Sequence, residues 1–171
     1  MANIQENKKA FLSYLQNNVK RNGVRNVVTL LESSTFFTDP ATTKYAGSYP
    51  GGLCEHSLEV YRALYELLGL AKFKGLGVSH ESLAIIGLLH DIYKIGTMRP
   101  VVKRQQDPVT GQFNDVEGYE FVDRPLSLGK AEESIITLIS HGFPMTPEEM
   151  CAIRWIRGNQ VEASIAADNM P

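Results

Sequence analysis

Residues 83–95 read LAIIGLLHDIYKI and are apolar on nearly every side of a helix. A helix that is apolar all round lies inside a protein rather than on its surface. We therefore expect this stretch to form the central buried helix, with Ser79 as its N-cap. His90 and Asp91 stand together in its C-terminal part. An ionised carboxylate in such surroundings needs a charged partner or a metal ion.

The apolar spacing on either side of this stretch predicts further helices. Their expected ranges are 5–20, 24–32, 51–68, 131–140, a helix that starts at Pro147, and 161–169. Residues 33–50 are expected to form an extended surface connection. Met98 to Asp123 contains two β-branched and aromatic runs around turn residues, which predicts a β-hairpin. The sequence thus predicts an all-α bundle of six or seven helices with one β-hairpin excursion.

Length and composition favour a single domain over residues 1–171 in a cytoplasmic protein. A formal net charge of −2 argues against a surface that coats nucleic acid. The longest apolar stretch, residues 83–89, is too short to cross a bilayer, and the N-terminus lacks the apolar core of a signal peptide. Cys54 and Cys151 form no CxxC pair, so we expect free thiols. The oligomeric state is left open.

Three residues are candidates for one metal site. His56 lies in a polar triplet, residues 55–57, on the helix that precedes the central one. If these two helices pack together, His56 meets His90 and Asp91. Imidazole nitrogens combined with carboxylate oxygens suit Mn, Fe, Co, Ni or Zn better than Ca or Mg. The pattern therefore predicts a divalent transition-metal site.

Two more polar residues are expected near that site. Lys94 follows Asp91 by three residues, on the same face of a helix, and would offer a positive charge to a phosphate oxygen. Asp168, in the apolar setting SIAADNM, could be a fourth ligand, or simply a polar residue at a helix end.

Ordinary structural roles compete with these interpretations. A lone histidine on an apolar helix is more often a core residue than a ligand, and a His-Asp dipeptide is common by chance. His80 is expected in a loop, and His141 is expected to stabilise a helix end. Cys54 and Trp155 are expected to be packing residues.

Three motifs taken together carry a resemblance. They are GGLCEHSLEV (51–60), GLLHDIYKIG (87–96) and SIAADNM (164–170). The combination resembles the HD superfamily of metal-dependent phosphohydrolases, which are helical domains. The resemblance implies an HD-domain fold and one metal site whose ligands are His56, His90, Asp91 and Asp168. Lys94 matches a lysine often found after the family's His-Asp pair.

A narrower resemblance covers residues 36–158. It is to small HD hydrolases encoded by phages and prophages, and it includes PLSLGKAEES (125–134) and TPEEMCAIRW (146–155). The GGLCEHS stretch is also similar to that of HD-type 3′→5′ exoribonucleases. Relatives tend to carry histidine where this chain has Ala46, Lys130 and Ile156. Their joint absence implies a site with one metal ion, or one that has lost its chemistry.

The resemblance implies hydrolysis of a phosphate ester, on a phosphate-bearing small molecule or an oligonucleotide end. Asp91 or a nearby carboxylate such as Glu55 could accept a proton, and Lys94 and Lys130 would hold phosphate oxygens. Three basic residues of the first hairpin strand could close over the substrate or simply form a solvated face: Arg99, Lys103 and Arg104. Two alternatives remain: a non-catalytic HD module that binds a nucleotide or a protein, and a structural protein with a buried His90–Asp91 pair.

Overall fold

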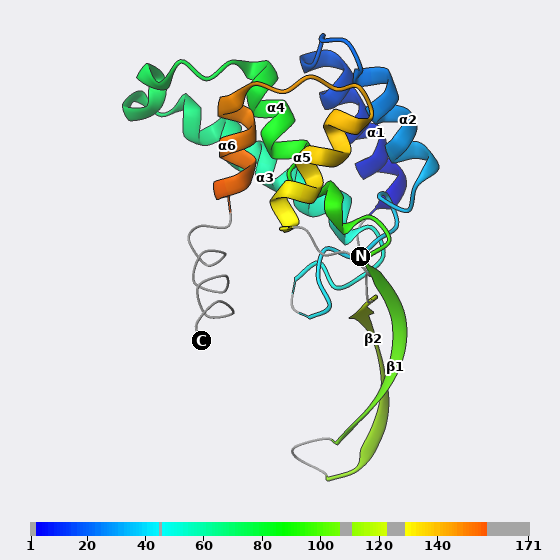
Figure 1. Ribbon diagram of the computed structural model, residues 1–171. Helices are drawn as coiled ribbons and strands as arrows, with labels where there is room; N and C mark the ends of the chain where they lie inside the picture. Colours follow the sequence, from blue (N-terminus) through cyan, green and yellow to red (C-terminus); the bar gives the residue numbers. More distant parts are fainter. Residues whose placement is uncertain (1–2, 45, 107–110, 123–128, 157–171) are drawn as a thin grey trace, which may run out of the picture.

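The computed structural model describes residues 3–44, 46–106, 111–122 and 129–156 (Figure 1). The helices in this part of the chain are α1 (Ile4–Asn18), α2 (Val24–Ser33), α3 (Gly52–Gly69), α4 (His80–Leu89), α5 (Lys130–Ser140) and α6 (Pro147–Trp155). Two short 3-10 helices, η1 (Ala71–Leu76) and η2 (Ile92–Lys94), follow α3 and α4. The strands are β1 (Met98–Gln106) and β2 (Phe113–Phe121).

Helix α4 lies at the centre of the helical body, as its apolar sequence predicts (Figure 1). Ser79 caps it, because its hydroxyl oxygen accepts a hydrogen bond from the backbone N–H of Ser82 at 2.9 Å. α4 packs against α1, α3 and α6. Its side chains Leu83, Ile85 and Leu88 are buried. Burial of apolar area by this helix is a main source of stability for the fold.

Part of the connection between α2 and α3 enters the core, so the expectation of a surface segment is wrong for that part. Phe36 and Phe37 are buried there. The ring centroid of Phe36 lies 5.0 Å from that of Phe11 on α1 in an edge-on arrangement. The many small polar residues around these two phenylalanines suggested solvent exposure, but the two aromatic side chains pack into the core.

Asp39 ties this connection to two other segments. Its backbone carbonyl oxygen accepts from the N–H of Leu53, 3.0 Å away, at the start of α3. Its side-chain oxygen Oδ2 accepts from the N–H of Gly96 at 2.8 Å and from the hydroxyl of Thr35 at 2.7 Å. Asp39 is buried. The start of α3 and the turn before β1 are therefore held at a fixed spacing.

The close packing at the start of α3 explains one of the paired glycines before Leu53. A Cβ at Gly52 would lie 2.2 Å from the carbonyl oxygen of Gly47. No larger residue fits there without a shift of backbone. This glycine brings the loop of residues 47–51 against the first turn of α3, the helix that carries His56.

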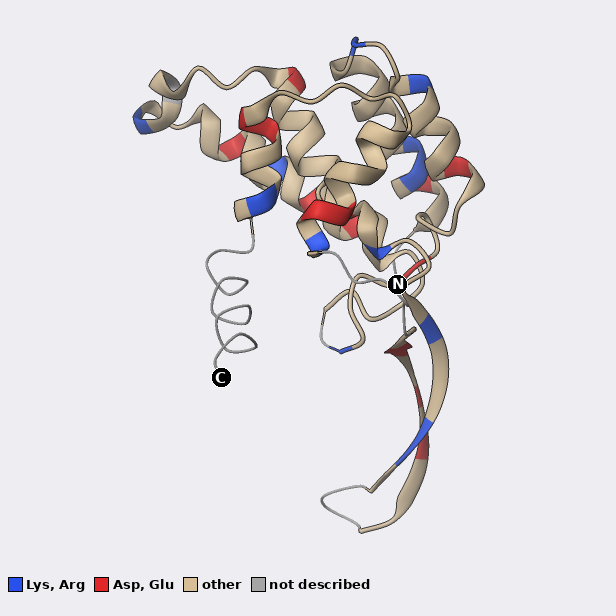
Figure 2. Ribbon diagram, viewed as in Figure 1, with Lys and Arg blue, Asp and Glu red and all other residues tan. Residues whose placement is uncertain are grey.

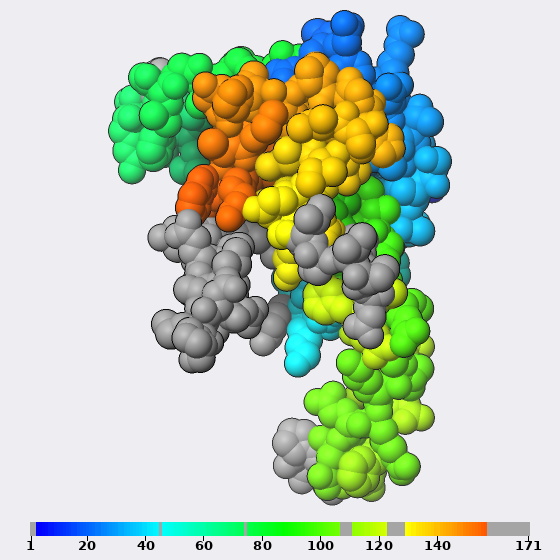
Figure 3. Space-filling view, in the orientation of Figure 1, coloured from blue at the N-terminus to red at the C-terminus, as the bar shows by residue number. Residues whose placement is uncertain are grey.

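The strands form an antiparallel hairpin that projects from the helical body (Figures 1 and 3). A hairpin is expected between Met98 and Asp123, and strands of nine residues each lie there. The expected class, an all-α HD-domain bundle, is however wrong. The described residues form a mixed fold of six α-helices and a two-stranded antiparallel sheet, mostly helical and not clearly a bundle.

Acidic and basic residues are scattered over the helices and the hairpin (Figure 2). The helix expected over 161–169 lies outside the described residues. Within the described part, no helix is both long and apolar enough to cross a membrane.

Candidate metal centre

His90 and Asp91 lie just beyond α4 rather than within it. The helix ends at Leu89, and His90 is its C-cap. Asp91 has φ −109° and ψ 16°, outside the helical range, and η2 begins at the next residue. His90 keeps helical dihedral angles, φ −60° and ψ −30°, so the expectation that both residues are helical is wrong for Asp91. The apolar run continues past the end of the helix, so periodicity alone gave no sign of this turn.

The turn brings three candidate ligands together. The Oδ2 atom of Asp91 lies 3.4 Å from Nε2 of His56 and 3.4 Å from Nε2 of His90. One ligand atom from each residue lies within 4.8 Å of the others. His90 and Asp91 are only 4% and 2% exposed, whereas the His56 side chain, from α3, is partly exposed. The predicted meeting of His56 with the His-Asp pair is present.

The other ring nitrogen of His90 has a fixed partner. Nδ1 lies 3.0 Å from the carbonyl oxygen of Gly87. Because a carbonyl oxygen can only accept, Nδ1 carries the hydrogen and donates it. Nε2 is then the atom that faces Asp91. Metal-binding histidines in proteins are commonly oriented by such a bond from the second nitrogen.

Gly87 also allows α3 and α4 to approach closely. A Cβ at this position would lie 2.7 Å from Cα of Tyr61 on α3. Since His56 stands on α3 and His90 at the end of α4, this contact helps to determine the distance between the two imidazoles. Their ring centroids are 5.5 Å apart.

Ser134 on α5 holds the backbone of the turn, a role that the sequence analysis did not predict. Its hydroxyl donates to the carbonyl oxygen of His90 at 2.7 Å and accepts from the N–H of Tyr93 at 3.2 Å. The side chain is fully buried. A buried hydroxyl amid the apolar residues of 131–140 is the only signal that could have indicated this role, because a buried polar group requires partners.

Lys94 lies where the sequence predicts, beside Asp91. Its Nζ atom is 2.6 Å from Oδ2 of Asp91. Burial disfavours the charged form of Asp91 and acts to raise its pKa, but hydrogen bonds from His56 and His90 and the charges of His90 and Lys94 outweigh burial. The pKa of Asp91 is therefore held well below its ordinary value, and the carboxylate is ionised.

The cluster opens into a hollow of about 270 Å³. Its lining residues are His56, Val60, His90, Asp91, Lys94 and Ile156. Ile156 is one of the three positions at which the resembling family tends to have histidine. The other two, Ala46 and Lys130, are exposed residues that do not line this hollow.

The remaining predicted site residues lie elsewhere. Lys130 is the first residue of α5, and its Nζ lies 5.9 Å from the ring centroid of Phe121. Asp168 lies outside the described residues. Arg99 pairs with Glu120 on the neighbouring strand, its Nη2 atom 2.8 Å from Oε1. Lys103 and Arg104 are exposed.

Two of the four residues assigned ordinary roles are found in them, and two are not. Nδ1 of His141 lies 2.8 Å from the carbonyl oxygen of Thr137, at the end of α5. His80 is the first residue of α4 rather than part of a loop. Cys54 is buried, as expected of a packing residue. Trp155 is largely exposed, so the expectation of a core residue is wrong.

The donor set fits a divalent transition metal. It combines two imidazole nitrogens with an ionised carboxylate, and one imidazole is already oriented by its second nitrogen. The ligands stand beside a cation and an open hollow, where a further ligand or substrate could reach them.

The interpretation of this site as a metal centre rests on its residues alone. No protein-family model matches the chain, and comparisons with curated proteins and with solved structures found no match.

Proposed function

We propose that this protein is an HD-type, metal-dependent phosphohydrolase that hydrolyses a phosphate ester of a nucleotide or short oligonucleotide. One observation carries the proposal: His56, His90 and Asp91 converge on a common point beside Lys94, at the floor of an open hollow. One divalent ion would be held by these three residues, with Asp168 as a candidate fourth ligand. A bound divalent ion would supply Lewis acidity and neutralise charge that develops on the phosphate.

The side chains would contribute in distinct ways. Lys94 supplies a compact positive charge that can hold a non-bridging phosphate oxygen. Asp91 has a second oxygen, Oδ1, that could accept a proton from the attacking water, although its lowered pKa makes it a weak base. His90 keeps its geometry because Gly87 fixes its ring. Lys130 could join from the start of α5 only by reaching away from Phe121.

A second function is favoured by one specific residue. Ile156 places an apolar side chain against the hollow at a position where relatives tend to carry histidine. A module that binds a nucleotide or a protein without turning it over would suit that change. Such a module would retain metal and ligand but release no product.

The test compares the metal content of the purified full chain with that of His90→Gln and Asp91→Asn variants. The His141→Gln variant is the matched control, since it removes a histidine that does not belong to the cluster. Each protein is then assayed with nucleotides and short oligonucleotides.

Three results are distinguishable. Near-stoichiometric metal and turnover in the wild type and the control, both lost in the two site variants, would support the hydrolase. Metal without turnover would favour the binding module. No metal in any variant, even after reconstitution, would contradict both and leave the cluster as a structural ion pair.

A further inference from the structure

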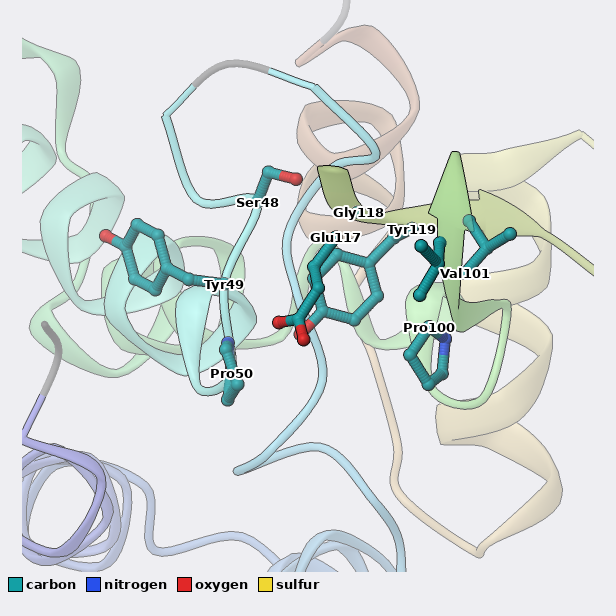
Figure 4. A pocket seen from close by; sticks show the side chains of 9 residues that line it. Ser48, Tyr49, Pro50, Pro100, Val101, Glu117, Gly118 and Tyr119 are labelled. Carbon is teal, nitrogen blue, oxygen red and sulfur yellow. The ribbon is translucent and has the colours of Figure 1, made fainter. Parts of the chain in front are cut away.

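A second, larger hollow of about 510 Å³ lies between the loop before α3 and the base of the hairpin (Figure 4). The loop supplies Ser48, Tyr49 and Pro50. The hairpin supplies residues 100–102 of β1 and 117–119 of β2. We call this hollow, which the sequence did not predict, the hairpin cleft.

The strand register explains which hairpin side chains face the cleft. Pro100 is paired with Tyr119, and Val102 with Glu117. Because alternate residues of a strand share a face, these four side chains lie on one side of the sheet. Figure 4 shows Glu117 and Tyr119 projecting from β2 toward the loop. One wall of the cleft is thus an aromatic ring beside a carboxylate.

The walls of the cleft are attached next to the candidate metal centre. The hydroxyl of Tyr49 donates to Oε2 of Glu55 at 2.5 Å, and Glu55 immediately precedes His56. β1 begins four residues after Lys94. Asp39 joins the two attachments through Leu53 and Gly96. The segments that carry the cleft and the metal centre are therefore joined both along the chain and through Asp39.

The charges of the two hollows are complementary to the two ends of a nucleotide. The metal centre offers Lys94 to a phosphate. The cleft offers Glu117, which repels phosphate but accepts hydrogen bonds from N–H and O–H groups. Tyr119 and Pro100 offer flat, apolar surfaces on which a ring can stack. Among the described residues, neither Glu117 nor the Tyr119 hydroxyl has a hydrogen-bond partner, so both polar groups are open to a ligand.

We infer that the hairpin cleft binds the uncharged nucleoside end of the substrate, with a ring against Tyr119 and its hydrogen-bond donors on Glu117. This inference rests on the proposed hydrolysis of a phosphate ester for the placement of the phosphate. It adds a specificity site, because the hairpin would select the group to which the phosphate is attached.

Binding and kinetics test the inference together. Binding of adenosine, guanosine, 2′-deoxyguanosine and ribose to the metal-free full chain is measured by calorimetry or ligand-observed NMR. KM and kcat are measured in the metal-loaded protein for a nucleotide and for glycerol phosphate, which has no ring. The variants are Tyr119→Ala and Glu117→Gln. Val116→Ala is the control, because Val116 is an exposed residue on the opposite face of the same hairpin.

The expected result is nucleoside binding that Tyr119→Ala weakens about tenfold and Glu117→Gln weakens several-fold. KM for the nucleotide rises by similar factors, while kcat and the constants for glycerol phosphate stay unchanged. A preference for guanosine over adenosine would place the base on Glu117, whereas binding of ribose, or loss on removal of the 2′-hydroxyl, would place the sugar there. Either pattern would support binding of the nucleoside end in the hairpin cleft.

The inference would be overturned if Tyr119→Ala changed nucleoside affinity and nucleotide KM no more than Val116→Ala does. It would also be overturned if neither variant changed them. Failure of the proposed function looks different. In that case no phosphate is released from either ester, but nucleoside binding still depends on Tyr119.

Discussion

The ammonium nitrogen of Lys94 lies 2.6 Å from Oδ2 of Asp91, the same oxygen that lies 3.4 Å from Nε2 of both His56 and His90. Lysine and a metal ion would therefore share one carboxylate. Lys94 balances the buried negative charge of Asp91 when no metal ion is bound. Its positive charge also repels a metal ion that approaches the same carboxylate.

This relationship predicts opposite effects of one substitution. Lys94→Gln should raise the affinity for a divalent metal, by about tenfold, because a nearby positive charge is removed. Hydrolysis should fall by about 100-fold or more, because a phosphate oxygen loses its partner. Metal titration against a chelator and phosphate release measure the two effects. Lys103→Gln, at an exposed lysine, is the control. Weaker metal binding in Lys94→Gln would contradict the proposal that Lys94 opposes the metal ion.

Close contact between α3 and α4 should be essential to the site. Gly87→Ala places a Cβ 2.7 Å from Cα of Tyr61, so the helices must separate. We expect a loss of about 1–3 kcal/mol in the free energy of unfolding and weaker metal binding. Denaturant unfolding and metal titration test this. Gly69→Ala, at the end of α3 with no atom within 4 Å of the added Cβ, should leave both quantities nearly unchanged.

Ser134 should support the site without contacting a ligand. Ser134→Ala leaves the N–H of Tyr93 and the carbonyl of His90 without this buried partner. The expected cost is about 1–3 kcal/mol of stability, with metal affinity lowered several-fold. Ser140→Ala, on an exposed part of the same helix, is the comparison. Equal metal affinity in both variants would show that Ser134 has a purely structural role.

Arg21 should stabilise the fold independently of the metal. Its guanidinium lies 2.8 Å from Oε2 of Glu149, a carboxylate only 1% exposed, and 3.2 Å from Oε2 of Glu81. Arg21→Ala leaves Glu149 buried without this partner, so unfolding should become about 3 kcal/mol easier. Metal affinity should not change. A loss of metal binding in this folded variant would contradict the assignment.

The same cluster predicts a pH dependence. A hydrogen bond from the backbone N–H of Lys20, opposed by burial and aided by Arg21, lowers the pKa of Glu81. A carboxyl group whose folded pKa is lowered adds stability above its unfolded pKa and loses it as the pH falls through the folded pKa. Stability should thus decline in acid, over a range that starts near the ordinary glutamate pKa. The decline should be shallower in Glu81→Gln, as followed by denaturant unfolding across that range.

The two thiols should react at very different rates. Burial, together with the negative charge of Glu55, raises the pKa of Cys54 to about 12. Cys151 is exposed. Titration with a thiol reagent should show one fast thiol in the native protein and two after denaturation. Cys151→Ser should remove the fast one, and a fast thiol that persists in that variant would contradict the assignment.

The sequence was sufficient for the parts of this fold that depend on apolar burial. The all-apolar run around Ile85 predicted the central helix, and the alternating segments after Met98 predicted the hairpin. The meeting of His56 with His90 and Asp91 followed from the packing of two helices. The expected class, an all-α bundle, was wrong because the hairpin strands have nine residues each and the helices do not clearly form a bundle.

Other features depend on contacts between distant residues, which a local pattern does not contain. Ser134 lies 44 residues from His90, and Asp39 lies 57 residues from Gly96. The turn after Leu89 contains no glycine or proline, and its backbone is bonded by Ser134 from a distant helix. The hairpin cleft joins a loop at residues 48–50 to strand residues 100–102 and 117–119. Such features require the three-dimensional arrangement.

Asp39 holds two distant segments of this molecule at a fixed spacing. One short side chain and its own backbone carbonyl connect Gly96 to Leu53, so the entrance of α3 and the root of the hairpin keep a constant separation. The metal centre and the hairpin cleft would then bind the phosphate end and the nucleoside end of a ligand at a set distance from each other. Under that arrangement a substrate is accepted for its length as well as its chemistry, and a longer linker between phosphate and ring would be rejected even when both ends fit.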